Sequence, residues 1–494
     1  VPIVLRSCRF LLLACLLALS VGGCSEEPTA PDASPEIQRA SDAERTSILL
    51  ITLDTTRADR LGVETRQVDT PQLEALTARG LYFTQAYSTT PTTLPSHTSM
   101  LTGLYPTEHG IRENGRRVSE KVDLLPVLLK AQGYTTAAFV SGFPLAAQFG
   151  LARGFDHYDD DFGPDRAERT ATETTDLALA FLNEGTVSLF LWVHYFDPHD
   201  PYEPPEPFRS QYPDDPYSGE IAYMDQQVGR LVAAFEERFD GQPRKIVVVG
   251  DHGEALGDHG EALHGNLLYQ GAMRVPLIVA GDDIVPGVVD QAVSVRQVFA
   301  TLLGWAGGEH PGGLLDGAGE PVLAEALKPY LQYGWQPQFM AVHDGIKVIR
   351  SGETEIYDVL ADPKETQNLA GQTELSSELR EAIANYSAKA LAKEGASQDE
   401  LSQEAREKLA SLGYFGSSSR PVLREDAPNP KDMVHLYGDL DVGAGHFIRQ
   451  EYEAAIPVFA RLSEADPDNF MVALRLAVAY SASGDPQKAE AVSY

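Results

Sequence analysis

The sequence predicts an α/β fold, in which a mostly parallel sheet is sandwiched by helices. Three short apolar runs, at residues 48–53, 189–193 and 246–249, have the length and composition of buried strands. Segments with helical periodicity, such as TPQLEALTARG and LPVLLKAQG, lie between the runs. Strands that alternate with helices form parallel sheets covered on both faces, so we expect the three runs in the middle layer of the fold.

The composition limits the class of protein and its partners. The chain has 494 residues, of which 43% are hydrophobic, enough for one large core and a smaller module. Its net charge of −33 repels the phosphates of nucleic acids, which excludes nucleic acid as a natural partner. An anionic substrate would be repelled as well, so it needs a strong local positive charge such as a bound cation.

The N-terminal segment resembles a bacterial lipoprotein signal. Two arginines precede an apolar run at residues 10–19, and Val-Gly-Gly stands directly before Cys24. We therefore expect a signal peptide over 1–23, an acylated Cys24 and a flexible tether over 24–45; an ordinary secretory peptide cleaved nearby is the alternative. This predicts an extracytoplasmic protein that is lipid-anchored in a bacterial membrane and faces the periplasm or the cell surface. All three cysteines lie in this segment, so the rest of the chain has no thiol site.

The segments that follow the first domain differ in character. We expect a catalytic domain over 46–315 and a small α+β subdomain over 316–390, which contains IKVIR and EIYDVLADPKETQNLA. Residues 391–432 are charged and helical and then rich in Ser and Pro, so they are interpreted as a linker.

Residues 433–494 show a period of about 34 residues that resembles tetratricopeptide repeats. Ala455 recurs as Ala489 and Gly443 as Ala477. About one and a half units are present where such arrays need about three, so we expect the sequence to be truncated. Repeats of this kind stack into surfaces that bind protein partners; a plain helical hairpin is the alternative.

Polar residues follow two of the predicted strands and suggest a metal site. Asp54 comes directly after the first run, and Asp251 and His252 come after the third. Ligands of parallel sheets bind beyond the carboxyl ends of the strands, so these side chains are expected to converge. Two carboxylates and an imidazole suit a divalent cation. A single Asp at a strand end more often caps a turn or helix, and only the combination favours a metal.

The motif that contains Asp251 and His252 occurs twice in succession. DHGEALG at 251–257 is followed by DHGEALH at 258–264. Only the first copy directly follows a strand, so the metal pair is assigned to it and the second copy to a loop. His264 is expected either to carry an imidazole toward a leaving group or to lie on the surface.

A hydroxyl-rich segment, TTPTTLPSHTSMLTG, contains the candidate nucleophile Thr93. A helix that begins near Ser96 would place Thr93 just before its N-terminus, where free amides and the helix dipole favour an anionic oxygen. A threonine hydroxyl reacts only when a base or a metal activates it. The alternative is a Ser/Thr cap in a loop.

Residues 93–103, TLPSHTSMLTG, resemble the signature of the sulfatase family of the alkaline phosphatase superfamily. LYPTEHGIRENG, YFDPHDPY, AYMDQQVGRL, VVVGDHGEALGDHG and LYQGAMRVPLIV resemble later blocks of that family in the same order. The resemblance covers about 46–385. It implies an alkaline-phosphatase-like sheet sandwiched by helices, followed by the small subdomain and an all-α repeat tail.

The resemblance also implies roles for individual residues. Asp54, Asp251 and His252 would be metal ligands, and Thr93 would be the nucleophile, bound to the metal through its oxygen. The side chains expected to contact the transferring group or the leaving oxygen are Asn114, His199 and His264, and His97 stands where the family has an arginine.

Three departures from the family pattern change the expected chemistry. The usual nucleophile is a Cys or Ser oxidised to formylglycine, which Thr93 cannot become, so its ester must be cleaved by attack at the central atom. Phosphorus tolerates that route well. VSGF at 140–143 replaces the Gly-Lys-Trp-His block that clamps sulfate. Thr55 stands where many sulfatases have another Asp, which favours zinc or manganese over calcium, although calcium is possible.

The sequence thus predicts a metal-dependent hydrolase of a small-molecule, glycan or lipid ester, which is a sulfate or, favoured by Thr93, a phosphate or phosphonate. The first alternative is a transferase of the phosphoethanolamine or glycerophosphate type. Such transferases usually carry transmembrane helices, and the sequence shows no apolar run of that length. The second alternative is a catalytically dead homologue that serves as a binding or scaffold protein.

Overall fold

The computed structural model describes residues 45–185, 188–317, 319–392, 401–414 and 423–492. The chain forms two units, residues 1–40 and 41–494, and the first of these lies outside the described residues. The signal peptide, the acylation of Cys24 and nearly all of the tether therefore stay predictions. Within the described ranges, every helix is too short or too polar to cross a membrane.

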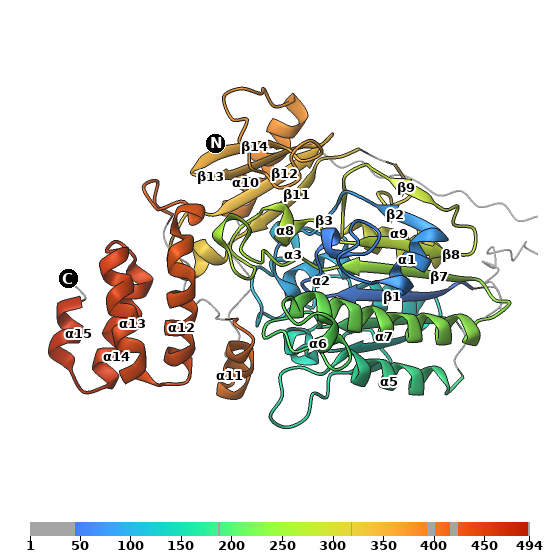
Figure 1. Ribbon diagram of the computed structural model, residues 1–494, viewed down its shortest axis with the longest axis horizontal. Helices are drawn as coiled ribbons and strands as arrows, with labels where there is room; N and C mark the ends of the chain where they lie inside the picture. The colour runs from blue at the N-terminus through green and yellow to red at the C-terminus, as the bar shows by residue number, and fades with distance from the viewer. Residues whose placement is uncertain (1–44, 186–187, 318, 393–400, 415–422, 493–494) are drawn as a thin grey trace, which may run out of the picture. The chain divides into compact units, whose positions relative to one another are not determined.

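An eight-stranded sheet forms the centre of the second unit (Figure 1). Its strand order is β5-β4-β6-β1-β7-β8-β2-β9. Strand β8 runs antiparallel to both of its neighbours, whereas the other paired strands of this sheet are parallel. The mostly parallel sheet predicted from the sequence is therefore confirmed. The strands are β1 (Ser47–Leu53), β2 (Gly80–Phe83), β4 (Thr135–Val140), β5 (His157–Asp159), β6 (Leu189–Tyr195), β7 (Arg244–Gly250), β8 (Leu277–Gly281) and β9 (Gly287–Val289).

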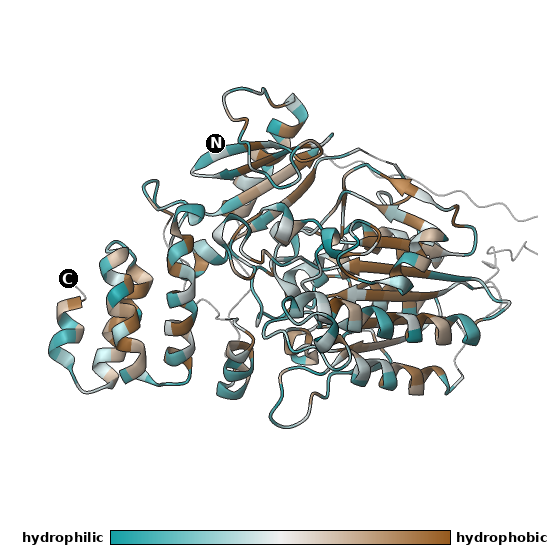
Figure 2. Cartoon of the chain, in the orientation of Figure 1, coloured by the Kyte–Doolittle hydropathy of each residue, from teal (hydrophilic) through white to brown (hydrophobic). Residues whose placement is uncertain are grey.

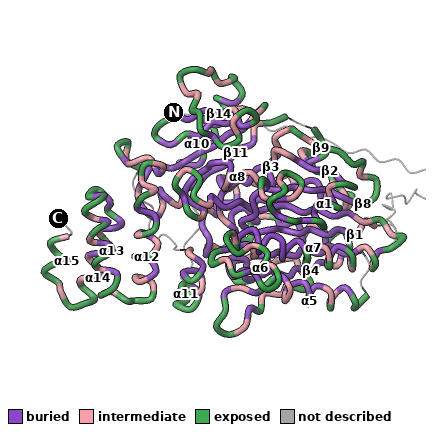
Figure 3. Tube along the Cα trace, in the orientation of Figure 1, coloured by how far each residue is buried: buried purple, intermediate pink, exposed green. Residues whose placement is uncertain are grey.

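Both faces of this sheet are covered, which explains why the predicted strands are apolar along their whole length. In β1, Ile48 and Leu50 pack with α2, α4 and α9, whereas Leu49 and Ile51 pack with α1, α5 and α7. The central strands are hydrophobic in Figure 2 and buried in Figure 3. Successive side chains of a strand point to opposite faces, so burial on both sides requires a continuous apolar run. The helices are α1 (Pro71–Ala78), α2 (Thr93–Thr102), α4 (Leu125–Ala131), α5 (Ala171–Leu182), α7 (Pro216–Arg238) and α9 (Gln297–Trp305).

Shorter elements connect these layers. A two-stranded ladder pairs β3 (Ala86–Tyr87) with β10 (Val293–Ser294) in parallel. The short helices are α3 (Pro106–His109), α6 (Phe208–Gln211) and α8 (Gln270–Met273). These connections keep the chain close to the sheet between its long elements.

A second sheet follows the first in the chain. It is antiparallel, with the order β11-β12-β13-β14, and α10 (Ser377–Ala392) packs on β12. This sheet and helix confirm the expected α+β subdomain. The strands are β11 (Val322–Ala326), β12 (Gln338–His343), β13 (Ile346–Ser351) and β14 (Glu353–Asp358).

The end of the chain is all helical, as predicted. Ala455, Phe459 and Leu462 of α13 are buried in one cluster with Leu476 of α14. The indole Nε1 of Trp335 also donates a hydrogen bond to the Asp466 carboxylate at 2.7 Å, which ties the end of α13 to the preceding domain. The helices are α12 (Tyr437–Ile448), α13 (Tyr452–Ala465), α14 (Phe470–Ala482) and α15 (Pro486–Val492).

Part of the segment interpreted as a linker packs on the catalytic domain. Helix α11 (Gln403–Ser411), which lies next to α12 in Figure 1, contacts α12 and also the short helical turn at Phe143–Leu145. Ala405, Leu409 and Leu412 are buried in the core cluster that contains α2. Residues 401–414 are thus a packed part of the catalytic domain, although their charge suggested a solvated connection. The charged residues face solvent while the apolar face is buried, as in an amphipathic helix.

Candidate active site

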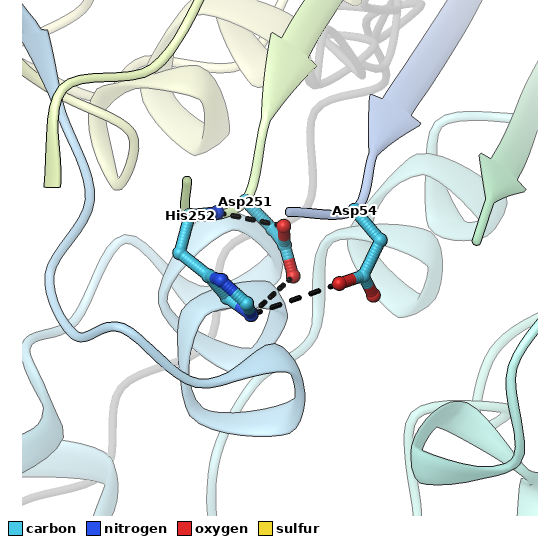
Figure 4. Close-up of side chains that lie close together, drawn as sticks. All are labelled: Asp54, Asp251 and His252. Carbon is cyan, nitrogen blue, oxygen red and sulfur yellow. Dashed lines mark hydrogen bonds and ion pairs between the residues drawn. The ribbon is translucent and has the colours of Figure 1, made fainter. Parts of the chain in front are cut away.

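The register of the central strands brings the predicted metal ligands to one level. Leu53, the last residue of β1, pairs with Gly250, the last residue of β7. Asp54 and Asp251 therefore leave neighbouring strands at the same edge of the sheet, and Figure 4 shows both carboxylates with the ring of His252. Adjacent parallel strands lie about 4.8 Å apart, so the short side chains of both aspartates reach one point.

These three side chains form a cluster that fits a divalent cation. The Nε2 atom of His252 is 3.7 Å from Oδ1 of Asp54 and 3.5 Å from Oδ2 of Asp251. The ligand atoms of all three residues lie within 4.8 Å of one another. Both of these carboxylate oxygens are buried and lack a hydrogen-bond partner among the described residues. Buried carboxylate oxygens without partners are costly, and a cation held between them removes that cost.

The protonation of the cluster supports the same assignment. The Nδ1 atom of His252 lies 3.0 Å from the carbonyl oxygen of Gly253, which can only accept, so Nδ1 carries the proton and Nε2 presents a lone pair to the carboxylates. Burial lowers the pKa of His252 to about 3 and keeps the ring neutral. Burial also raises the pKa of Asp54 and, together with the charge of Asp54, that of Asp251.

Asp54 is oriented by a histidine on the neighbouring strand. His194 lies on β6 next to β1, and its Nε2 is 3.1 Å from Oδ2 of Asp54. Its Nδ1 accepts a hydrogen bond from the backbone amide of Ser141 at 3.3 Å, so the proton is on Nε2 and is donated to Asp54. His194 is fully buried, and it supports the cluster through this hydrogen bond.

Thr93 lies beside this cluster at the start of α2. Its Oγ1 atom is 3.4 Å from Nε2 of His252, and the residue is fully buried. Helix α2 begins at Thr93, with Thr92 as its N-cap, three residues before the predicted start at Ser96. That prediction was wrong because Pro95 lies in the first turn, where the missing N–H is not needed. Thr93 thus sits at the positive end of the helix dipole, which favours negative charge on its oxygen.

His97 was predicted to be a catalytic residue, and its ring holds the backbone of Thr93 in position. Its Nδ1 donates to the carbonyl oxygen of Thr93 at 2.9 Å, and its Nε2 accepts from the hydroxyl of Thr52 at 3.0 Å. Burial lowers the pKa of His97, so the ring stays neutral. Because both ring nitrogens already have partners, the geometry gives His97 a positioning role.

Asn114 contacts the start of helix α2 and lines a cavity. Its Oδ1 accepts a hydrogen bond from the amide of Leu94 at 2.8 Å, which caps a free N–H of α2. Its Nδ2 is buried and finds no hydrogen-bond partner in the described residues. The cavity lined by Asn114 has a volume of about 420 Å³, and its other lining residues include His199, His264, Lys328 and Asp441 of α12. Asn114 therefore lies between the start of α2 and this cavity.

His199 and His264 are brought together, and both face the same hydroxyl group. Their ring centroids are 5.5 Å apart, and their Nε2 atoms lie 3.1 Å and 3.2 Å from the phenol oxygen of Tyr414. Burial lowers the pKa of His199 to about 4 and that of His264 to about 3. The Nδ1 atom of His264 is 3.1 Å from Oε1 of Glu254, which fixes the orientation of the ring.

Tyr414 and Glu254 were missed by the sequence analysis. Tyr414 follows α11, and its hydroxyl lies 3.2 Å from Oγ1 of Thr93. Burial raises the pKa of this phenol well above its usual value, so it keeps its proton. The apolar spacing of EAREKLASLGY, which ends in a glycine and an aromatic residue, was the available signal for a packed helix at this point. Glu254 lies inside the first copy of the repeated motif, where only the preceding Asp251 and His252 were predicted to have a role.

The second copy of the DHGEAL motif lies outside the metal cluster. Its first residues form a short turn at Asp258–Gly260, where Asp258 pairs with Arg57 at 2.9 Å and His259 stacks on Tyr269 at 3.5 Å. The copy therefore begins in the loop in which it was expected.

A mostly parallel sheet with carboxylate, imidazole and hydroxyl side chains at one edge defines an α/β enzyme with its site at the strand ends. The family model for sulfatases matches residues 46–308, more than half of the chain, so this protein belongs to the sulfatase family. It is a hydrolase of ester bonds within the alkaline phosphatase superfamily. A second family model, for the tetratricopeptide repeat, matches residues 446–492 and confirms the nature of the helical tail.

Individual relatives cover most of the sulfatase-like region. An uncharacterized sulfatase of Escherichia coli is 22% identical over 437 residues, which is 69% of this chain and 87% of that protein. The choline-sulfatase of Rhizobium meliloti is 24% identical and covers 61% and 77% of the two chains. The structure of a phosphonate monoester hydrolase from Silicibacter pomeroyi has a TM-score of 0.56 at 20% identity, covering 70% of this chain and 95% of that one. The structural likeness confirms the fold.

Proposed function

We propose that this protein hydrolyses a sulfate, phosphate or phosphonate ester through a covalent ester of Thr93, with phosphorus esters favoured. One observation carries the proposal: the hydroxyl of Thr93 lies 3.4 Å from Nε2 of His252, beside two carboxylate oxygens that have no hydrogen-bond partner among the described residues. Such a cluster suits one divalent ion, for which zinc or manganese fits the mixed oxygen and nitrogen donors best and calcium is possible. An ion held there would polarise the ester and lower the pKa of the Thr93 hydroxyl.

The reaction is a two-step displacement, in which Thr93 and the residues around it have different roles. Oγ1 of Thr93 attacks the central atom, a bond from Oγ1 forms, and the bond to the leaving oxygen breaks. The proton lost from Thr93 is balanced by one that the leaving oxygen gains, and we assign the transfer to His199 and His264, which line the neighbouring cavity. Water then attacks the central atom, the Thr93 ester is cleaved, and Oγ1 regains its proton. Nδ2 of Asn114, which has no hydrogen-bond partner among the described residues, would stabilise charge on the transferring group.

The preference for phosphorus follows from the identity of residue 93. A threonine cannot be converted to the aldehyde hydrate that expels sulfate by collapse, so its ester must be opened by attack at the central atom. Phosphorus accepts such attack more readily than sulfur. The proteins that resemble this one include sulfatases and a phosphonate monoester hydrolase, so both chemistries occur among them.

The protein is further proposed to act outside the cytoplasm on a small-molecule, glycan or lipid ester. The signal-like segment before Cys24 supports anchoring to a bacterial membrane through an acyl chain. The helical repeats support binding of a protein partner, because stacked helix pairs present extended surfaces. Detection of a diacylglyceryl group on Cys24 by mass spectrometry would test the anchoring, and an unmodified protein released to the medium would contradict it.

The central test compares Thr93→Ala with Thr93→Ser. The purified proteins are assayed with 4-nitrophenyl phosphate, bis(4-nitrophenyl) phosphate, a 4-nitrophenyl phosphonate and 4-nitrophenyl sulfate, and their metal content is determined. We expect Thr93→Ala to keep the metal and lose turnover by roughly 10⁴-fold or more, whereas Thr93→Ser keeps measurable activity. Full activity in Thr93→Ala would refute the nucleophile. Metal binding in the parent without turnover of any of these esters would support a binding homologue instead.

A further inference from the structure

The phenol oxygen of Tyr414 occupies a central position in the site. It lies 3.2 Å from Oγ1 of Thr93, 3.1 Å from Nε2 of His199 and 3.2 Å from Nε2 of His264. These are the candidate nucleophile and the two imidazoles assigned to the leaving oxygen. Tyr414 lies beyond residues 46–308, where the sulfatase family model ends, so the site is completed by a later segment of the chain.

The position of Tyr414 is set by the end of α11. The amide of Tyr414 donates to the carbonyl of Leu409 at 2.9 Å, and the amide of Gly413 donates to that of Ala410 at 3.1 Å. Gly413 has a φ of +78°. These two bonds and the left-handed glycine form a Schellman motif, which ends a helix with a defined change of direction. Leu409 and Leu412 anchor the helix in the core, so the phenol is held by packed structure.

The hydrogen bonds around the phenol show that its proton is available for donation. The Nδ1 atom of His199 lies 2.8 Å from the carbonyl of Asp200, so that nitrogen carries the proton and Nε2 presents a lone pair. The Nδ1 atom of His264 lies 3.1 Å from a carboxyl oxygen of Glu254. The phenol O–H can therefore donate to the lone pair on Nε2 of His199, and Nε2 of His264 lies 3.2 Å from the same phenol oxygen. An anionic oxygen is a stronger acceptor than either imidazole, so the phenol would turn its proton to such an oxygen.

A group transferred to Thr93 from the cavity side would lie next to this phenol, because Tyr414 lines that cavity and its hydroxyl is 3.2 Å from Oγ1. When Oγ1 bonds to a tetrahedral centre on this side, the other oxygens of that centre lie around the central atom, where one of them can accept a hydrogen bond from Tyr414. We propose, on the basis of the function proposed above, that Tyr414 is a catalytic residue whose hydroxyl donates a hydrogen bond to an oxygen of the group that Thr93 receives. The phenol keeps its proton throughout, and it acts together with the free amide of Asn114.

The test is Tyr414→Phe, which removes one oxygen and leaves the ring. We expect kcat for bis(4-nitrophenyl) phosphate to fall roughly 10²-fold, as for the loss of one donor to a transition state, with KM changed less than about threefold. Orthovanadate, which resembles the transferring group, should bind roughly tenfold more weakly to the variant. Gly413→Ala keeps the phenol but strains the turn that positions it, so this variant should also have a lower kcat.

The matched control is Tyr134→Phe. The hydroxyl of Tyr134 donates to the carbonyl of Thr46 at 2.8 Å, before the first residue of β1 and so at the opposite edge of the sheet. Metal content and melting temperature are measured for every variant, and kcat of the control should equal that of the parent.

An increase in turnover or tighter vanadate binding in Tyr414→Phe would show that the phenol merely blocks the site and would overturn the proposal. An unchanged kcat in both Tyr414→Phe and Gly413→Ala would overturn it as well. Thr93→Ala is assayed in parallel to separate the two hypotheses. If Thr93→Ala stays active, the proposed function fails; if it is inactive while Tyr414→Phe behaves as the parent, only the role of Tyr414 fails.

Discussion

His194 donates a hydrogen bond from Nε2 to Oδ2 of Asp54 at 3.1 Å, and the other oxygen of that carboxylate is left facing His252. The bond joins neighbouring strands, since Thr52 of β1 pairs with His194 of β6. It holds one oxygen of the carboxylate in place and thereby directs the second toward the metal cluster. Partners of this kind commonly set metal affinity although they never touch the ion.

Replacement of His194 should therefore weaken metal binding. We expect His194→Asn, which cannot reach Asp54, to lower metal affinity roughly 10- to 100-fold. His194→Gln places an amide near the former Nε2 position and should recover part of the loss. Competition with a chromophoric chelator measures both affinities, and equal affinity in His194→Asn and the parent would refute a role of this bond.

Metal removal should destabilise the protein through its two buried carboxylates. Without a cation, Asp54 and Asp251 remain close together and poorly solvated, so chelator treatment should lower the melting temperature. Asp251→Asn removes one of the charges, and we expect the metal-free variant to exceed the metal-free parent by about 1–3 kcal/mol in the free energy of unfolding. The same variant should show no stabilisation by added zinc. Denaturant unfolding with and without metal checks both statements, and a metal-free variant less stable than the parent would contradict them.

Glu254 should affect turnover through the orientation of His264. One oxygen of Glu254 is 3.1 Å from Nδ1 of His264, and the other accepts a hydrogen bond from Tyr202 at 3.0 Å. Glu254→Gln leaves the shape unchanged but can present its amide to the imidazole in place of an oxygen. We expect kcat to fall roughly 10- to 100-fold while metal content stays constant. An unchanged kcat would show that the ring needs no such support.

The buried pair of Lys347 and Glu365 should matter for stability and leave the chemistry unaffected. The two side chains are 2.6 Å apart and almost fully buried, and Glu365 also accepts the amide of Gln270. Lys347→Met leaves an unpaired buried carboxylate, so we expect a loss of about 3–5 kcal/mol in the free energy of unfolding. The double variant with Glu365→Gln should recover much of this loss. Urea unfolding measures the effect, and kcat at a temperature where the variants are folded serves as the control.

Asp225 should make stability depend on pH. Its carboxylate accepts the amides of Gln72 and Leu73 at the start of α1, and burial raises its pKa from 3.8 to about 7. Between these values the folded state binds more protons than the unfolded chain, so this group's contribution is largest below its unfolded pKa and is lost as the pH rises through 7. The free energy of unfolding of the parent minus that of Asp225→Asn should therefore decrease from about pH 5 to about pH 8, because only the parent loses this contribution. A difference independent of pH would contradict the shift.

The sequence allowed the convergence of Asp54, Asp251 and His252 to be predicted because these residues follow features that are easily recognised. Asp54 and the pair Asp251 and His252 each follow a continuous apolar run, and parallel strands bring such positions to one edge. The first copy of the repeated motif was distinguishable from the second for the same reason, since only one of them follows a strand.

Other parts of the site depend on contacts between distant residues, which local sequence patterns do not predict. His194 lies inside an apolar strand, and its contact with Asp54 follows from the pairing of β1 with β6. Tyr414 reaches Thr93 across more than 300 positions in the chain, at the end of a charged helix that resembles a linker by composition. The start of α2 was misplaced because proline usually interrupts a helix, whereas Pro95 lies in the one turn where it is tolerated.

The level pairing of Leu53 with Gly250 has a consequence for how relatives of this protein can diverge. One residue inserted into either strand would move its ligand by about 3.3 Å along the sheet and turn it to the opposite face. Metal–ligand distances tolerate only about 0.2 Å. Homologues should therefore keep the lengths of these two strands even where their apolar side chains interchange freely, and gaps in an alignment should collect at the opposite edge of the sheet.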